Sequence, residues 1–270
     1  MLPKFQQFIQ ERQYLHNVSP ATLEWYKHAF KWLRTESPDQ AELKDAVLRM
    51  RERGLKATGS NSAIRAINAY LKWTESPLKI QQLKEPHLIL PTFSVPDIQK
   101  LAAWKPKGFY QVRLHVFVLA LIDTGCRNSE AIDLRWVDVD FDNLLMKLQG
   151  KGSKERLVPF SFELRRHLFQ WRKRNRWDLV FPGRKGQRLG RRNMLRDVKW
   201  VCKRLGIVPP ARTIHAFRHT FAVNYLRKGG SVFHLQKVLG HSTLEMTRRY
   251  ANLMTEDLQA VHEKISLLSR

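Results

Sequence analysis

The segment TIHAFRHTFAVNYL, residues 213–226, has the pattern of an amphipathic helix that carries charge at its beginning. Its apolar residues recur at roughly helical spacing, at Phe217, Phe221, Val223 and Leu226. His215 and Arg218 lie three residues apart, so a helix presents them on one face. An imidazolium and a guanidinium on one face repel each other, and an anion held between them removes the repulsion. The segment therefore predicts a helix whose first turn binds an anion.

The composition indicates which anion this is. The 270 residues include 48 Lys and Arg against 24 Asp and Glu, a formal charge of +24. An excess of this size favours a polyanionic partner, with nucleic acid the usual one and an anionic membrane the rival. Residues 165–204 hold fifteen Lys or Arg and two acidic residues, with three tryptophans between them. This stretch predicts a surface that faces phosphates.

Membrane insertion and an oxidising compartment are both disfavoured. The longest apolar run, LHVFVLALI at 114–122, has about half the length of a membrane span and contains a histidine, so it predicts a buried helix. No signal peptide is recognisable. The two cysteines, Cys126 and Cys202, are far apart and form no CxxC pair. A reduced, cytoplasmic protein is expected.

The sequence predicts two domains. Residues 1–75 carry helical patterns throughout, with Ser19 before Pro20 and Ser37 before Pro38 predicted as helix N-caps. Residues 76–96 contain four prolines and predict a linker. Residues 97–270 are mixed and form the second domain. The fold class is therefore mostly α with a small antiparallel β-sheet.

The sheet is predicted in the second domain. WVDVDFD (136–142) alternates like a strand, and NLLMKLQ (143–149) and ERLVPFS (155–161) are β-prone runs separated by glycines. They predict a hairpin with Lys151 at or near its tip. Helices follow, with N-caps expected near Ser161, Thr213, Ser231, Ser242 and Thr255.

Metal and nucleotide chemistry find little support in the sequence. His215 and His219 have the HxxxH spacing of a zinc helix, but Ala216 stands where a protease needs glutamate, and Arg218 would repel a cation. A carboxylate metal cluster would need Asp133, Asp138, Asp140 and Asp142. These residues fall in a predicted strand and turn, where acidic side chains commonly face water. No GxxxxGK[ST] loop is present. We predict neither a metal nor a cofactor.

Four motifs in order resemble the catalytic signature of the tyrosine recombinases, also called the phage integrase family. They are TGCRNSE (124–130), GKGSKERLVP (150–159), HAFRHTFA (215–222) and LGHSTLEMTRRY (239–250). Each is weak alone, but together they are specific. The resemblance implies the family's two-domain architecture, with 1–75 as a helical, SAM-like core-binding domain that binds DNA, 76–96 as linker and 97–270 as the catalytic domain.

The resemblance also implies a role for six residues. Arg127 and Arg218 bind the scissile phosphate, and His215 hydrogen-bonds it and assists proton transfer. Lys151 protonates the departing 5′ oxygen, His241 contacts the phosphate, and Tyr250 is the nucleophile. Outside these six, Lys154 and Arg156 are expected to contact the DNA backbone, Glu130 to orient Arg127, and His219 to be structural.

The implied reaction is metal-free site-specific recombination of double-stranded DNA through a 3′-phosphotyrosyl intermediate. Four protomers would assemble on two sites at the nucleoid, clamp the duplex between the two domains, and exchange strands through a Holliday junction. Accessory DNA-bending proteins are compatible with it. The helix expected near 255–268 would dock on a neighbouring protomer or on its own domain.

Several alternatives stay open at this point. They are a type IB topoisomerase, a catalytically silent sequence-specific DNA-binding protein with the same fold, and an RNA-binding protein explained by charge alone. Within the family, the sequence permits a phage or mobile-element integrase and a chromosome-dimer resolvase. Because the chain begins with the core-binding helices, an arm-binding domain is not expected.

Overall fold

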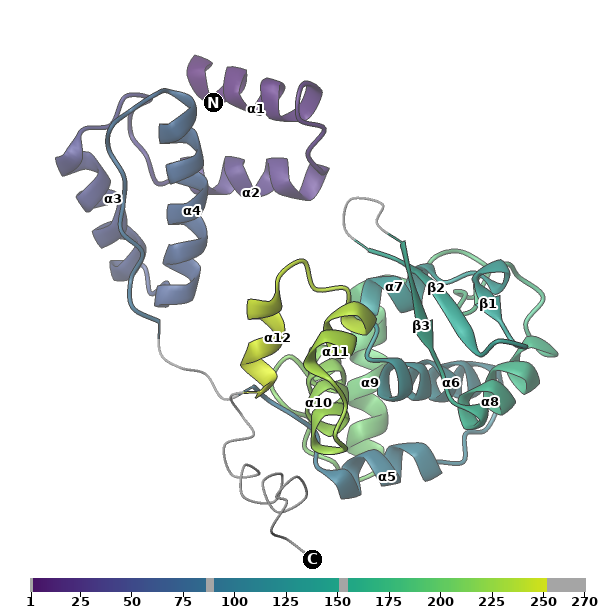
Figure 1. Ribbon diagram of the computed structural model, residues 1–270. Coiled ribbons are helices and arrows are strands. Elements are labelled where there is room, and N and C mark those ends of the chain that lie inside the picture. The colour runs from purple at the N-terminus through teal and green to yellow at the C-terminus, as the bar shows by residue number, and fades with distance from the viewer. Residues whose placement is uncertain (1, 86–89, 151–154, 252–270) are drawn as a thin grey trace, which may run out of the picture. The chain divides into compact units, whose positions relative to one another are not determined.

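The chain forms two compact units, Met1–Leu88 and Ile89–Arg270, in a computed structural model that describes residues 2–85, 90–150 and 155–251 (Figure 1). The described residues form helices and one three-stranded antiparallel sheet, which confirms the predicted fold class. The first unit contains α1 (Pro3–Tyr14), α2 (Pro20–Phe30), α3 (Gln40–Glu52) and α4 (Ala57–Trp73). The helices of the second unit are α5 (Val95–Ala103), α6 (Phe109–Thr124), α7 (Asn128–Asp133), η1 (Trp136–Asp138), α8 (Phe162–Arg172), α9 (Arg191–Arg204), α10 (Thr213–Arg227), α11 (Val232–Leu239) and α12 (Leu244–Ala251).

The first unit packs its four helices around an aromatic core. Phe8 lies edge-to-face against both Phe30 and Tyr70, with centroids 5.6 Å apart in each pair. Ser19 caps α2 as predicted, since its hydroxyl accepts the Thr22 amide. The cap predicted at Ser37 is wrong. Asp39 caps α3 instead, because its carboxylate lies directly before the first turn and accepts the Glu42 amide at 2.8 Å.

Two asparagines of α4 fasten the chain that follows this helix. The Asn68 side chain donates to the Ile80 carbonyl and accepts from the Ile80 amide, both at 2.9 Å. Asn61, two turns earlier, makes the same pair of bonds with Leu83, at 2.8 and 2.7 Å. Each amide side chain thus satisfies both the N–H and the C=O group of one residue in the segment that follows α4.

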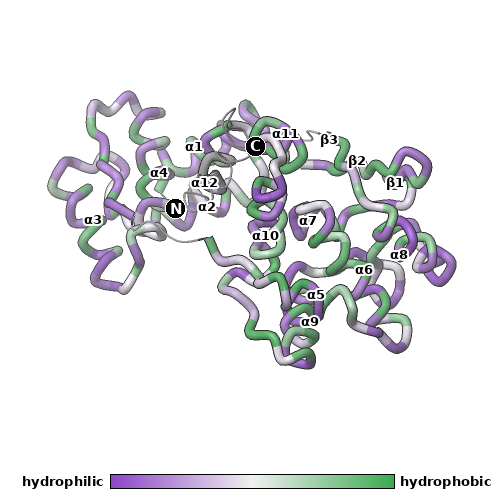
Figure 2. The backbone as a smooth tube through the Cα atoms, turned by 60° about the horizontal axis from the view of Figure 1, so that its bottom comes forward, coloured by the Kyte–Doolittle hydropathy of each residue, from purple (hydrophilic) through white to green (hydrophobic). Residues whose placement is uncertain are grey.

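The second unit is built around α6. This helix packs against α5, α7, α8, α9 and α10, and the apolar run 114–122 lies inside it, as predicted. Phe117 and Leu121 are fully buried. Hydrophobic and hydrophilic positions both occur along the surrounding helices (Figure 2), and buried apolar residues of these helices share one core cluster with those of α6.

The sheet has the order β1–β2–β3, with β1 at Val139–Asp140, β2 at Leu145–Gln149 and β3 at Glu155–Pro159. The hairpin of β2 and β3 is confirmed, with register running from the pair Leu145–Pro159 to the pair Gln149–Glu155. WVDVDFD is only partly a strand, because its first three residues form the 3₁₀ turn η1. Lys151 and Lys154 lie outside the described residues.

The last described helices, α10 to α12, pack against one another (Figure 1). Ser161 and Ser231 cap α8 and α11 as predicted. Thr213 does not cap α10. The cap position is Arg212, in a left-handed conformation with φ 55°, and the Thr213 hydroxyl donates back to the Pro210 carbonyl. The helix expected near 255–268 lies outside the described residues.

Candidate active site

Arg218 is a buried cation held by two backbone carbonyls. It lies in the second turn of α10 and is 5% exposed. Its guanidinium donates to the Gly125 carbonyl at 3.0 Å and to the Leu239 carbonyl at 2.6 Å. Burial, and next the charge of Arg127, lower the pKa of Arg218 to about 10. The group therefore stays charged at neutral pH and is fixed in orientation.

Arg127 stands just before α7 and is the more accessible of the two arginines. Its guanidinium donates to one Glu130 oxygen at 2.8 Å, and its backbone amide donates to the other at 2.7 Å. A weaker bond of 3.4 Å runs to the Gly240 carbonyl. The side chain is 34% exposed, so it can reach a ligand from solvent. Glu130 orients Arg127 as predicted.

Glu130 also binds a third arginine, Arg156 of β3. Two parallel bonds of 2.8 Å join the guanidinium to both carboxylate oxygens, and Nε donates to the Val238 carbonyl at 2.8 Å. The sequence predicts that Arg156 contacts the DNA backbone. Its guanidinium instead bonds Glu130 and Val238 within the protein, and the side chain is only 12% exposed. The pairing spans a helix and a strand, so no local pattern signals it.

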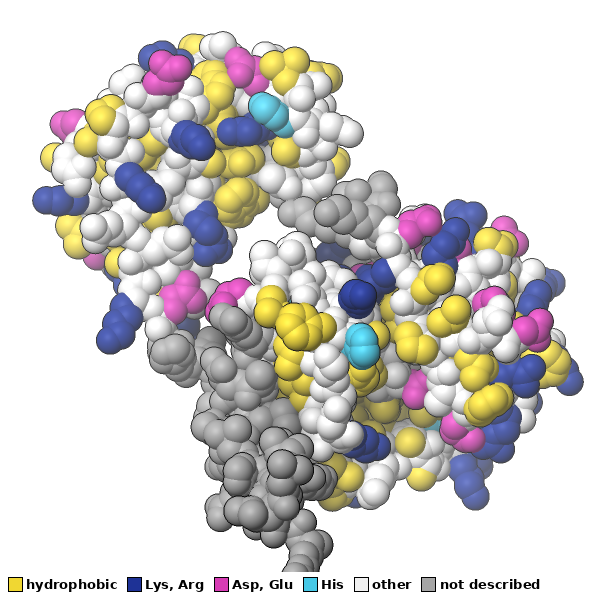
Figure 3. Space-filling model, in the orientation of Figure 1, with side chains coloured by type: hydrophobic (Ala, Val, Ile, Leu, Met, Phe, Trp, Pro, Cys, Tyr) yellow, Lys and Arg dark blue, Asp and Glu magenta, His cyan; other side chains and the backbone are white. Residues whose placement is uncertain are grey.

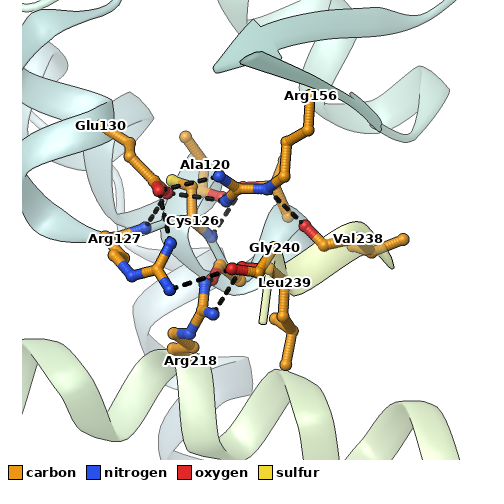
Figure 4. A network of polar contacts seen from close by, with 11 residues as sticks. Ala120, Cys126, Arg127, Glu130, Arg156, Arg218, Val238, Leu239 and Gly240 are labelled. Atoms are coloured by element: carbon orange, nitrogen blue, oxygen red, sulfur yellow. Dashed lines mark hydrogen bonds and ion pairs between the residues drawn. The ribbon is translucent and has the colours of Figure 1, made fainter. Parts of the chain in front are cut away.

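The three arginines meet at the C-terminal end of α11. Consecutive carbonyls there each accept a hydrogen bond, Val238 from Arg156, Leu239 from Arg218 and Gly240 from Arg127 (Figure 4). The last carbonyls of a helix lack intrahelical partners and carry the negative end of its dipole. This end, together with the Glu130 carboxylate, explains how three guanidiniums lie close together. Three positive charges against one carboxylate leave a net charge of +2 to attract an anion.

Two glycines allow this close approach. Gly125 and Gly240 end α6 and α11 in left-handed conformations, with φ of 61° and 63°. A Cβ on Gly125 would lie 2.5 Å from the Phe221 ring, and one on Gly240 would lie 2.8 Å from Cδ of Arg156. Both positions therefore require glycine for sterics as well as for backbone conformation.

Two of the predicted histidines lie beside the arginines. His215 is in the first turn of α10 and exposed, and burial of part of its ring, followed by the charge of Arg212, lowers its pKa. His241 hydrogen-bonds the Thr247 hydroxyl through Nδ1 at 2.9 Å. Burial and the charge of Arg218 lower the pKa of His241 to about 4. Its ring is therefore neutral at pH 7.

Tyr250 comes from α12, which packs against α10 and α11. It is 4% exposed, and its ring lies parallel to that of His241, with an interplanar angle of 7° and centroids 6.2 Å apart. Its hydroxyl is 3.0 Å from Nδ1 of His219. The phenol also lies near enough to Arg218 to raise the pKa of the guanidinium, against the larger effect of burial. The structure thus brings Arg127, His215, Arg218, His241 and Tyr250 into one region.

His219 is the residue whose place sequence reasoning missed. It was expected to be structural, yet it contacts the hydroxyl of Tyr250. A signal was present, because the HxxxH spacing puts His215 and His219 on one helix face.

Three of the four carboxylates named for metal binding have separate partners. Asp133 pairs with Arg188, Asp138 with Lys147, and Asp140 accepts the amides of the turn at 142 and 143. Across the described ranges, no group of three or more His, Cys, Asp or Glu is arranged to hold a metal ion. None of the helices described here is long and apolar enough to cross a membrane.

The basic stretch 165–204 is largely on the surface. Fourteen of its fifteen Lys and Arg residues are exposed, and Arg165 is half-buried. Figure 3 shows Lys and Arg side chains at the lower right of the second unit, where Figure 1 places α8. The tryptophans differ, since Trp171 is fully buried in the core whereas Trp200 is 43% exposed beneath the guanidinium of Arg204.

Glu130→Gln should destabilise the second unit in a pH-dependent way. Burial opposes ionisation of Glu130, but bonds from Arg156 and Arg127 outweigh it and lower its pKa from 4.5 to about 2. A lowered folded-state pKa stabilises above the unfolded value, so this contribution, about 3 kcal/mol, is complete above pH 4.5 and lost as pH falls toward 2. Urea unfolding at pH 7 and pH 3.5 measures it.

Glu163→Gln is the matched control for this measurement. Glu163 pairs with Arg166 on α8, but both side chains are more than 60% exposed, and its loss should change the urea midpoint little. Equal midpoints at pH 7 for the wild type and Glu130→Gln would show that the buried carboxylate does not hold this arrangement together.

Comparisons with known proteins point to one family. A model of the phage integrase family matches residues 93–257, more than half of the chain. Tyrosine recombinase XerC from Xanthomonas axonopodis pv. citri (strain 306) is 28% identical over 236 residues, covering 83% of this chain and 77% of the relative.

Two solved structures share the fold. The Tn1549 transposon integrase in complex with transposon right end DNA has a TM-score of 0.76 at 20% identity, covering 98% of this chain and 100% of that one. XerH site-specific recombinase bound to difH substrate has a TM-score of 0.72 at 18% identity, covering 98% and 85%. At these identities the likeness concerns the fold.

Proposed function

The chain belongs to the phage integrase family and is a tyrosine recombinase, and from that premise we propose how it cuts and rejoins double-stranded DNA at specific sites. The Tyr250 oxygen attacks the scissile phosphorus, a 3′-phosphotyrosyl bond forms, and the bond to the 5′ oxygen breaks. The 5′ hydroxyl of a partner strand then attacks the phosphotyrosine, which restores the tyrosine and joins the strands. One phosphodiester replaces another, so the exchange consumes no nucleotide.

The observation that carries this proposal is the convergence of Arg127 and Arg218 on one helix end beside Tyr250. The two arginines would bind the non-bridging oxygens of the phosphate. Guanidiniums remain charged, are planar, and present paired donors that match phosphate geometry. Because backbone carbonyls and Glu130 already orient them, they need little reorganisation as charge develops on the phosphate.

The remaining roles concern protons and packing. Lys151, in the segment between β2 and β3, would protonate the departing 5′ oxygen. His215, exposed beside Arg218, would hydrogen-bond the same phosphate and assist proton transfer. His241, whose ring stacks on Tyr250, would contact the phosphate and fix the phenol ring. The lowered pKa values of His215 and His241 leave both imidazoles neutral at pH 7, which is compatible with the roles given to them.

The partners follow from the family and from the charge. We propose that residues 1–75 form the core-binding domain, that 97–270 form the catalytic domain, and that both contact duplex DNA. Four protomers would act on two sites and pass through a Holliday junction in the cytoplasm, at the nucleoid. The exposed basic side chains of 165–204 support DNA binding, and the two solved structures described above contain DNA substrates.

Two narrower questions remain within this proposal. We favour resolution of chromosome dimers over integration of a mobile element, because the curated relative is a Xer recombinase by name. A catalytically silent DNA-binding protein with the same fold is the alternative function. The orientation of Arg127 and Arg218 by buried bonds argues for retained catalysis, since DNA binding alone does not need it.

The proposed function predicts a covalent adduct that survives chelation. Selection from a random duplex pool gives the binding site, which is then remade with a nick beside the scissile phosphate, so that the cut end diffuses away. We expect a protein–DNA band on a denaturing gel in excess EDTA and without nucleotide, because fixed guanidiniums supply the positive charge. Activity that disappears with EDTA and returns with Mg²⁺ would contradict this mechanism.

A further inference from the structure

His219 contacts the atom that the proposed reaction uses as nucleophile. Its Nδ1 lies 3.0 Å from the hydroxyl oxygen of Tyr250, and the two rings are tilted by 47° with centroids 5.7 Å apart. His219 is half-buried in the middle of α10, one turn beyond His215. The contact joins two helices that pack directly, α10 and α12, so the helix packing fixes it.

We propose that His219 is the general base that takes the phenolic proton of Tyr250, an inference that rests on the proposed function. As the oxygen–phosphorus bond forms, the O–H bond breaks and its proton moves to Nδ1 of His219. The bond between phosphorus and the 5′ oxygen breaks at the same centre, and a separate acid protonates that oxygen. In the rejoining step the proton returns from His219 to the tyrosine oxygen.

The other histidines are arranged for different tasks. The His241 ring lies parallel to the Tyr250 ring, and its Nδ1 is paired with the Thr247 hydroxyl. His215 is exposed at the beginning of α10, where a phosphate can reach it. His219 points a ring nitrogen at the phenol oxygen, at the distance that proton transfer requires.

The charges around His219 suit a base whose pKa rises when the substrate binds. Burial, and then the charges of His215, Arg218 and Arg212, lower its pKa to about 4, so Nδ1 is free of a proton at pH 7 when Nε2 carries the hydrogen. A bound phosphate would offset these positive charges and raise the pKa toward the range in which imidazole accepts a proton effectively. The base would thus gain strength when DNA is in place.

The decisive variant is His219→Asn, because its amide can place a hydrogen-bond acceptor near the position of Nδ1 but cannot take a proton. We compare it with His219→Ala and with His234→Asn, an exposed histidine of α11, in single-turnover cleavage of the nicked duplex. We expect both His219 variants to bind DNA normally and to cleave about 10²-fold slower or worse, and His234→Asn to match the wild type. Gel shifts and thermal melts confirm binding and folding.

A second readout separates proton transfer from positioning. Ring fluorines on the residue-250 tyrosine lower the pKa of the phenol and supply phenolate without a base. If His219 is the base, the penalty of His219→Asn shrinks markedly in the fluorinated chain. If His219→Asn cleaves as fast as the wild type, His219 only positions the phenol. If either His219 variant cleaves faster than the wild type, the contact restrains the phenol. Each of these results overturns the inference.

The same experiment distinguishes failure of the inference from failure of the proposed function. If the wild type forms no adduct through Tyr250, the proposed function fails and the inference fails with it. If the adduct forms in the wild type and persists at full rate in His219→Asn, the inference alone is wrong.

Discussion

We expect the Tyr250→Phe chain to bind its DNA site with unchanged affinity and to form no covalent adduct. The substitution removes one oxygen and leaves the ring, which is 4% exposed and stacked on His241. Packing of α12 against α10 and α11 should persist, and loss of the hydrogen bond to His219 should cost about 1 kcal/mol of stability. Without the oxygen there is no nucleophile, so the adduct band should be absent.

Tyr225→Phe is the matched control, because Tyr225 is a half-buried tyrosine of α10 that packs on Phe221 and has no role in the proposed reaction. It should cleave at the wild-type rate. An adduct of undiminished intensity in Tyr250→Phe would remove Tyr250 as the nucleophile, and mapping the attached residue would then identify the true one. Weak binding by Tyr250→Phe would indicate instead that α12 had moved.

A sulfur-substituted substrate should rescue Lys151→Ala but not Arg218→Ala. A bridging 5′-phosphorothiolate leaves as a thiolate of low pKa and needs no proton, so loss of the general acid should matter little. Arg218 acts on the non-bridging oxygens, whose charge is the same with either leaving group. Its removal should slow cleavage of both substrates by about 10²- to 10³-fold, the cost of losing a donor to a developing oxyanion.

Two further variants control this comparison. Lys154→Ala, in the same segment between β2 and β3, should affect cleavage of both substrates equally, because a contact with the DNA backbone does not depend on the leaving group. Arg218→Lys keeps the charge but cannot bridge the carbonyls of Gly125 and Leu239, so it separates charge from orientation. Equal defects of Lys151→Ala on the oxygen and sulfur substrates would show that Lys151 is not the acid, and His215 would be the next candidate.

The local parts of this structure could be predicted from the sequence. The buried helix at 114–122, the hairpin of β2 and β3, and the caps at Ser19, Ser161 and Ser231 depend on residues close together in the chain. The cap predicted at Ser37 is wrong, because Asp39 is an equally good capping residue two positions later and the start of the helix depends on tertiary packing.

The contacts of the site are mostly tertiary, and this is why some were mispredicted. Arg156 looked like a surface residue because the strand pattern does not reveal its partner Glu130, 26 residues earlier. His219 looked structural because Tyr250 reaches it only through the packing of α12 on α10. The roles of Arg127, His215, Arg218, His241, Lys151 and Tyr250 stay predictions. The variants above test those of Arg218, Lys151 and Tyr250.

The end of α11 has a consequence for how the chain can vary. The groups that receive the three arginines are peptide carbonyls, which every amino acid possesses. Val238 and Leu239 can therefore be replaced by residues that suit the helix and its packing without disturbing the acceptors. Gly240 cannot, because its φ is 63° and a Cβ there would clash with Arg156. Main-chain atoms thus supply much of the support that orients the three arginines. Substitutions at Val238 and Leu239 would change the sequence of this segment and leave that support in place.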